Sequence, residues 1–422
     1  MAGKFNGKPT WSKPMPVHGQ GIVTFNITRN NAFMIKITKA STTDDIRLTI
    51  DLNSAEFGIT QNGKYSKLAE TAQTDSGYDA GRKISYWFSY NRDSLVFKYG
   101  KGYTMEETTE LVYDFLAGAR TPKKQEEIRQ KYYGLFNAED FGYVQFFDTT
   151  TANTDSDLID IEKSVSFRKN PFIRNLSPFV LDSKQATLFT LDNGNYMLTG
   201  SLSPACKELY DNICNTDLNW PPEVDEVLLS DAIRFSIETK GCLLYQKLQE
   251  KAGEFGPGSG REETYLRVTL GHSLGNSPGI PYVLEIWPAK HYSPIHNHGN
   301  ANAVIKVLFG QINVSLYNKQ TINPIAKPVK TFKAIKGDVT WITRDWFQTH
   351  KLWNSTDDFC ATIQCYSYDA GDTNHRPYFD YVSEHSTVEE FLPNSDFTFK
   401  YMRQNVLEEY RNKHGMLNPS HK

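Results

Sequence analysis

The chain has 422 residues, enough for two or three domains, and its charges nearly cancel at a formal net charge of −3. This balance gives no indication of nucleic acid or an anionic membrane as a partner. No apolar run reaches the length of a membrane span, and the first thirty residues contain no apolar signal core. The five cysteines are odd in number and include no C-x-x-C pair, which favours reduced thiols and a cytoplasmic location.

Short β-branched and aromatic runs, separated by Asn, Asp and Gly turns, dominate the first hundred residues. They are IVTFNIT, AFMIKIT, IRLTIDL, ISYWFSY and LVFKYG. The pattern predicts an antiparallel β-sandwich domain over residues 1–118. The aromatic run 86–90 with KYGKG at 98–102 is similar to sugar- or ligand-binding sandwich modules, so a sugar or protein ligand is one expectation. Core and edge aromatics are the favoured alternative.

A connecting region of helical and extended segments is expected over residues 119–200. Helices are predicted at 105–115 and at 121–133, the second capped by Thr121 ahead of Pro122. The polar stretch TTTANTDSD at 149–157 is the linker candidate.

The remaining chain, residues 201–422, is predicted to form one domain. Helices are expected at 206–214 and within 222–248, with a break at Gly241, and barrel strands from 282 to about 368. The tail is expected to end in a helix at 401–413 and to cap the barrel.

Two histidines stand two residues apart, His296 and His298, between runs that read as strands. Side chains at i and i+2 of a strand share a face, so both imidazoles can reach one metal ion. A third histidine, His350, follows a Gly-Asp turn and the run VTWI. An isolated H-x-H pair is common without a metal, but seven of the ten histidines fall between His272 and His385. This clustering favours a metal site in the mouth of an antiparallel barrel.

These residues resemble the cupin signature, whose second half ends in the H-x-x-x-N pattern that His350 and Asn354 reproduce. Cupins commonly carry a glutamate four or five residues past the second histidine, where Asn302 and Ala303 stand here. The resemblance therefore implies a site of three histidines without a carboxylate ligand.

A more specific resemblance is to cysteine dioxygenase and related thiol dioxygenases, and it covers roughly residues 264–367. The family pattern S-x-I-H-x-H matches 293–298, Trp287 matches the upstream tryptophan, and 348–355 matches the segment of the third ligand. Tyr366 corresponds to the family's active-site tyrosine, and Arg267 to the arginine that binds the substrate carboxylate. The resemblance implies a cupin barrel preceded by helices, with a mononuclear Fe(II) on three histidines and no organic cofactor.

Two positions depart from the family pattern. The cysteine that some members crosslink to the tyrosine is Ala303 here, so no thioether is expected. A Ser-x-His-x-Tyr relay reads Thr362, Gln364, Tyr366 in this chain, and Gln364 cannot titrate as histidine does. Gln364 is expected to keep a hydrogen-bonding and substrate-contacting role. The plain alternatives are a structural ion pair for Arg267 and a core hydroxyl for Tyr366.

The chemistry implied is the addition of both atoms of O2 to a thiol, cysteine by default among small thiol acids, to give a sulfinate. Three neutral imidazoles leave Fe(II) its full charge and three open positions for thiolate and dioxygen. Arg267 is expected to bind a carboxylate with its planar fork, and Tyr366 to hydrogen-bond the oxygen or the thiolate. One alternative keeps the three-His metal with a non-thiol substrate, and another is a non-catalytic ligand-binding cupin.

Overall fold

The computed structural model describes a set of ranges that together cover most of the chain. These are residues 5–39, 44–72, 75–136, 141–149, 161–173, 176–222, 227–256, 258–271, 282–318, 327–369, 371 and 378–416. The chain divides into two compact units, Met1–Asn175 and Leu176–Lys422. Among the described residues, no helix is long and apolar enough to cross a membrane.

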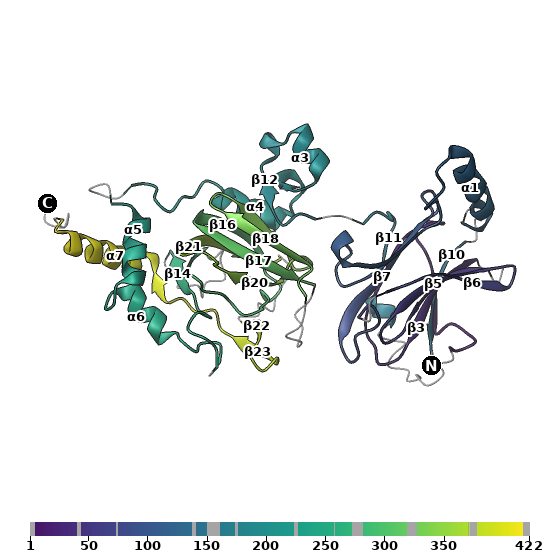
Figure 1. Cartoon of the computed structure of the whole chain (residues 1–422), viewed down its shortest axis with the longest axis horizontal. Coiled ribbons are helices and arrows are strands. Elements are labelled where there is room, and N and C mark those ends of the chain that lie inside the picture. The colour runs from purple at the N-terminus through teal and green to yellow at the C-terminus, as the bar shows by residue number, and fades with distance from the viewer. Residues whose placement is uncertain are drawn as a thin grey trace. The chain divides into compact units, whose positions relative to one another are not determined.

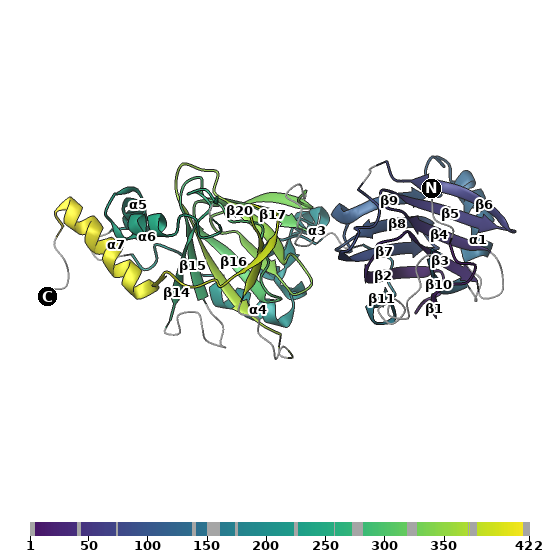
Figure 2. The ribbon, with the colours of Figure 1, turned by 90° about the horizontal axis from the view of Figure 1, so that it is seen from below.

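The first unit is an antiparallel β-sandwich of two sheets (Figure 2). One sheet has the order β1 (Trp11–Pro14), β10 (Phe141–Asp148), β3 (Phe33–Lys39), β4 (Asp45–Ile50), β5 (Ala55–Gln61) and β6 (Lys64–Glu70). The other has the order β11 (Val165–Arg168), β2 (Gln20–Thr28), β7 (Lys83–Asn91), β8 (Val96–Lys101) and β9 (Thr109–Asp114).

The expected aromatic run of β7 lies inside the sandwich. Tyr86, Phe88 and Tyr90 are buried in the core, and Trp87 is fully buried with its indole N–H donated to the carbonyl of Tyr103 at 2.9 Å. Side chains buried in this way stabilise the unit by removing apolar area from water, at roughly 25 cal/mol per Å². The aromatic run therefore packs the sandwich and presents no surface to a ligand.

The sandwich continues past the expected boundary at residue 118. β10 pairs with β1 and β3, and β11 pairs with β2, so the strands that complete both sheets come from the region expected to be a connector. The helix predicted at 105–115 is wrong: a short 3-10 turn, η1 (Glu106–Thr108), leads directly into β9. Pairing of β9 with β8 decides this, since an edge position in a sheet overrides a weak helical pattern.

The second predicted helix is present as α1 (Pro122–Phe136), and Thr121 caps it by accepting the backbone N–H of Lys124 at 3.3 Å. Its Ile128 and Tyr132 pack against the sandwich core. Nearly all of the linker candidate 149–157 lies outside the described residues.

The second unit is built around two antiparallel sheets (Figure 1). The larger has the order β19 (Val339–Ile342), β16 (Asn302–Phe309), β21 (Cys360–Ser367), β15 (Tyr282–Trp287), β14 (Leu266–Leu270) and β24 (Phe397–Thr398), the last joined in parallel. The smaller has the order β18 (Lys330–Ile335), β17 (Gln311–Tyr317) and β20 (Thr349–Trp353). Together they form a cupin barrel, as the sequence predicted. A further hairpin consists of β22 (Phe379–Val382) and β23 (Val388–Phe391).

Helices precede the barrel and return to it at the end of the chain. They are α3 (Leu188–Asn193), α4 (Pro204–Ile213), α5 (Leu229–Glu238), α6 (Leu243–Glu250) and α7 (Phe399–His414). The short elements before α4 are β12 (Val180–Leu181), η2 (Ser183–Gln185), β13 (Met197–Leu198) and η3 (Thr199–Ser201). The predicted break at Gly241 is confirmed: this residue has φ +92° between α5 and α6. α5, α6 and α7 pack together beside β14 (Figures 1 and 2).

Candidate metal centre

The histidine pair lies on an extended segment between β15 and β16 rather than on a regular strand. His296 forms isolated bridges with His350 on one side and with Tyr381 of β22 on the other. The backbone N–H of His296 donates to the carbonyl of His350 at 2.9 Å, and the reverse bond is 3.0 Å long. The predicted same-face geometry is therefore obtained through pairing with β20 and β22.

All three imidazoles are buried and converge. Candidate ligand nitrogens of His296, His298 and His350 lie within 4.8 Å of one another. The Nε2 atoms of His298 and His350 are 3.0 Å apart. Two nitrogens that bind one metal at about 2.1 Å and at right angles are separated by about 3 Å, so this pair fits adjacent ligands of one ion.

The protonation of the imidazoles suits metal binding. His296 Nδ1 lies 3.0 Å from the carbonyl of Pro294 and donates to it, which leaves Nε2 free as a ligand. Burial lowers the pKa of His296 to about 4, with the Pro294 hydrogen bond opposing the shift. Burial, together with the neighbouring imidazoles, also holds the pKa of His298 and of His350 well below its usual range. Metal binding needs neutral imidazoles, so no proton has to be displaced at neutral pH.

Aromatic side chains of the C-terminal hairpin cover the imidazoles. The Phe379 ring lies 4.8 Å from the His298 ring, centroid to centroid, and the Phe391 ring lies 6.3 Å from that of His296. The predicted capping of the barrel by the tail is thus achieved by β22 and β23 rather than by the terminal helix alone.

Arg267 of β14 and Glu285 of β15 form a buried ion pair next to the histidines. The two residues are register partners, and Arg267 Nη1 donates to Glu285 Oε1 at 2.5 Å. Their side chains are 8% and 3% exposed. Burial raises the pKa of Glu285 to about 7, against the lowering effect of the Arg267 charge. Burial is the largest single influence on the pKa of Arg267 and lowers it, but Glu285, Tyr366 and Tyr265 together outweigh burial and raise this pKa above its ordinary value.

A chain of side-chain hydrogen bonds links this pair to Tyr366. Gln364 Nε2 donates to Glu285 Oε2, and the Tyr366 hydroxyl donates to Gln364 Oε1. The amide orientation follows from its neighbours, because only the NH2 end can donate to a carboxylate. The Tyr366 ring stacks on His298 with centroids 5.7 Å apart. Burial, with the Glu285 charge, raises the pKa of Tyr366 above its ordinary value, so the phenol is protonated at neutral pH.

The structure brings the sequence-predicted residues together: Arg267, Gln364 and Tyr366 line one sheet face beside the three histidines. The roles expected for Arg267, Gln364 and Tyr366 toward a substrate remain predictions. Ala303 is the register partner of Tyr366, so the crosslink position is where the resemblance implies and carries no sulfur. All five cysteines are free.

Glu285 was missed by the sequence reasoning. Its signal was a single charged residue inside the buried strand YVLEIW, where a carboxylate needs a partner. Two further residues of this region form hydrogen bonds to backbone carbonyls. Asn354 Nδ2 donates to the carbonyls of Trp287 and Pro288, each at 3.0 Å. His291 Nδ1 donates to the carbonyl of Thr264.

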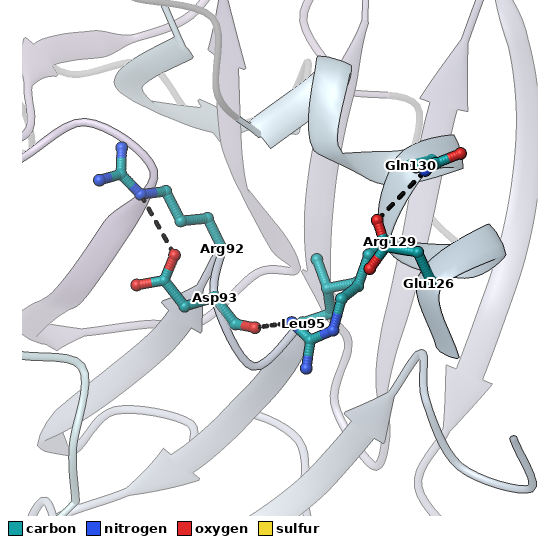
Figure 3. A pocket seen from close by; sticks show the side chains of 6 residues that line it. All are labelled: Arg92, Asp93, Leu95, Glu126, Arg129 and Gln130. Carbon is teal, nitrogen blue, oxygen red and sulfur yellow. Dashed lines mark hydrogen bonds and ion pairs between the residues drawn. The ribbon is translucent and has the colours of Figure 1, made fainter. Parts of the chain in front are cut away.

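The sandwich unit has a hollow of about 360 Å³ between the β7–β8 turn and α1 (Figure 3). It is lined by Arg92, Asp93, Leu95, Glu126, Arg129 and Gln130. Arg129 Nη1 donates to the carbonyl of Asp93, and Gln130 Nε2 donates to Glu126 at 3.2 Å. The lining is mixed in charge, with two arginines and two carboxylates.

No family model and no curated protein matches the chain. Among solved structures, it is similar to the cupin domain of Schizosaccharomyces pombe Cnp3, with 15% identity over 25% of this chain and 65% of that one, at a TM-score of 0.20. It is also similar to an oxalate oxidase, with 16% identity, 21% and 42% of the two chains covered, and a TM-score of 0.18. The DMSP lyase DddQ from Ruegeria pomeroyi gives 14% identity, 26% and 49% coverage, and a TM-score of 0.20. This chain therefore covers less than two thirds of the length of each of these three proteins. Its fold is assigned from its own strand order.

Proposed function

We propose that the second unit is a non-haem Fe(II) thiol dioxygenase, which oxidises a small thiol to its sulfinate with O2. The observation that carries the proposal is the buried set of three neutral imidazoles without a carboxylate in the group, within the described part of the chain. Bound there, ferrous iron would supply a redox-active cation with free positions for a thiolate and dioxygen. The reaction balances as R–SH plus O2 giving R–SO2H, so the thiol provides the electrons and no organic cofactor is required.

The chain's own residues would exclude water and set the hydrogen bonds around the substrate. Phe379 and Phe391 cover the imidazoles with apolar surface, which strengthens electrostatic interactions inside the site. Tyr366 stacks on one imidazole and is held by Gln364, so its oxygen has a defined position beside the metal site. Gln364 provides this orientation in place of a titrating histidine.

The test is oxygen uptake by protein loaded with iron under anaerobic conditions. Cysteine, 3-mercaptopropionate and cysteamine are offered, with serine as a control that lacks the thiol. Thiol-dependent uptake with one sulfinate formed per O2 supports the proposal. No uptake with any thiol, from protein shown to hold iron, contradicts it.

That second outcome would favour the alternative of a three-His metal cupin with a non-thiol substrate or with no reaction. Gln364 favours this alternative, since a glutamine cannot pass a proton along the strand. Offering 2-hydroxy and 2-oxo acids to the same iron-loaded sample separates a different oxygenated substrate from a binding protein.

For the sandwich unit we propose binding of a polar ligand such as a sugar. The hollow beside α1 supports it, because Arg92, Asp93 and Arg129 offer charged hydrogen-bonding groups around an apolar Leu95 (Figure 3). Binding of the full chain to an immobilised glycan panel, compared with Arg129→Ala, tests this role. The free cysteines support a reducing compartment such as the cytoplasm as the place of action.

A further inference from the structure

Arg267 is the residue that a carboxylated substrate would be expected to bind, but its charge already has a partner. Glu285 lies opposite it in the sheet register and accepts from Nη1 at 2.5 Å, with both side chains buried. Above about pH 7, where Glu285 is ionised, the buried guanidinium and carboxylate in contact have no net charge. The chain itself thus provides the anion next to the metal site.

The hydroxyl proton of Tyr366 is committed in the same way. It is donated to Gln364 Oε1, and the other end of that amide is held by Glu285. Glu285 accepts hydrogen bonds from both Arg267 and Gln364. It therefore fixes the direction of the hydrogen bonds that connect Arg267 to Tyr366. The Tyr366 hydroxyl therefore cannot also donate a hydrogen bond to an anionic group of a substrate.

Two buried donors on this wall have no hydrogen-bond partner among the described residues, Arg267 Nε and the hydroxyl of Thr362, which is the register partner of Glu285. A buried donor without an acceptor costs about 1–3 kcal/mol, so a ligand that supplies an oxygen there is favoured. A carboxylate would meet this need, but it would place a second negative charge on an arginine that Glu285 already neutralises, in a buried site. An uncharged oxygen meets it without that repulsion.

We propose that Glu285 determines substrate specificity at the metal centre, by selecting a small thiol whose second polar group is an uncharged hydrogen-bond acceptor, such as an amide carbonyl or a hydroxyl, over a thiol acid. The thiol part of this inference rests on the proposed function. The selection against carboxylates rests only on the positions of Arg267, Glu285, Gln364 and Tyr366.

The test compares two ligands that differ only at this group, 3-mercaptopropionamide and 3-mercaptopropionate. Cobalt-loaded protein is titrated without oxygen, and dissociation constants are read from the thiolate-to-metal absorption band. Wild type is expected to bind the amide at least about tenfold more tightly than the acid. Equal affinity, or tighter binding of the acid by wild type, overturns the proposal without any variant.

The variant Glu285→Gln keeps a hydrogen-bond acceptor for Arg267 and removes the charge. It is expected to lower the amide preference at least about tenfold, because Arg267 then has a free positive charge. The matched control is Glu254→Gln, which removes a partly buried carboxylate that pairs with Lys251 instead. The control is expected to retain the wild-type preference. An unchanged preference in a folded, cobalt-loaded Glu285→Gln also overturns the proposal.

Acetate and acetamide extend the test to ligands without sulfur, followed by the visible spectrum of the bound cobalt. Tighter acetate binding by Glu285→Gln than by wild type supports the role of Glu285 even where no thiol binds, and equal binding counts against it. Failure of every thiol to bind would instead contradict the proposed function. The two failures are therefore distinguishable.

Discussion

His296 and His350 are hydrogen-bonded to each other through their backbones in both directions, at 2.9 and 3.0 Å. This reciprocal pair places two imidazoles on one face although His296 belongs to no regular strand. The ring of His350 then meets that of His298 through their Nε2 atoms. The three-histidine cluster is thus assembled by pairing between segments more than fifty residues apart in sequence.

Replacement of either paired histidine is expected to abolish stoichiometric metal binding. In His296→Ala or His350→Ala, a site of three neutral ligands loses one, and metal affinity should fall by more than about 100-fold. Metal content after anaerobic iron loading and gel filtration measures the effect. His385→Ala, at an exposed position, is the control and should load as wild type does. Full loading of either site variant would show that these imidazoles are not ligands.

The metal-free protein should lose stability as the pH falls from about 6.5 to about 4. The pKa of His296 is lowered to about 4 in the folded protein, against 6.5 for an ordinary histidine, so the unfolded chain takes up the proton first. The free energy of unfolding should decrease by about 3 kcal/mol over this range from this residue, since one pKa unit corresponds to about 1.4 kcal/mol.

Urea unfolding of wild type and of His296→Asn across this pH range checks the prediction. Glu285 acts in the opposite direction, because its raised pKa makes protonation favour the folded state as the pH falls below about 7. That contribution is present in both proteins and cancels in the difference. If the difference in unfolding free energy between wild type and His296→Asn does not change with pH, the assignment of His296 as a buried neutral imidazole is wrong.

The Arg267–Glu285 pair should be strongly coupled in stability. Arg267→Met alone leaves a buried carboxylate without its cation and should destabilise the second unit by about 3–5 kcal/mol. The double variant Arg267→Met, Glu285→Leu removes both charges and should regain most of that loss. A double-mutant cycle of urea unfolding free energies measures the coupling. Additive effects of the two single changes would mean that the pair is not in contact.

The turn between β16 and β17 should require glycine at position 310. Gly310 has φ +69°, and a Cβ there would lie 2.6 Å from the carbonyl oxygen of Phe359. Gly310→Ala should therefore cost more than the roughly 1 kcal/mol expected from the backbone conformation alone. Gly337→Ala is the matched control, since Gly337 has φ +96° but no atom within 4 Å of the added carbon. Equal losses in thermal stability would show that the close approach is relaxed at little cost.

Much of the metal centre was predictable because its residues sit in short sequence motifs. The spacing of His296 and His298 and the later His350 predicted the three imidazoles that converge, and Ala303 stands opposite Tyr366 in the sheet register. The helix break at Gly241 followed from the freedom of glycine at positive φ. Local patterns of this kind depend only on residues close together in the chain, so they can be recognised without knowledge of the fold.

The limits of the sandwich were not predictable in the same way. The strands β10 and β11 join partners more than a hundred residues earlier, and β9 took the place of an expected helix. Strand pairing depends on which edges are free in the folded sheet, and no local propensity reports that.

The sequence by itself determined the three histidines that converge, the β-rich class of the chain and the residue types near this cluster. Only the tertiary structure decided how those residues are used. Glu285 lies beside Arg267 and balances the positive charge that a substrate carboxylate was expected to bind, and Gln364 accepts the hydrogen bond that the Tyr366 hydroxyl donates. The physical reason is that the charge and hydrogen bonds of a buried group depend on its neighbours across the sheet, which are far from it along the chain.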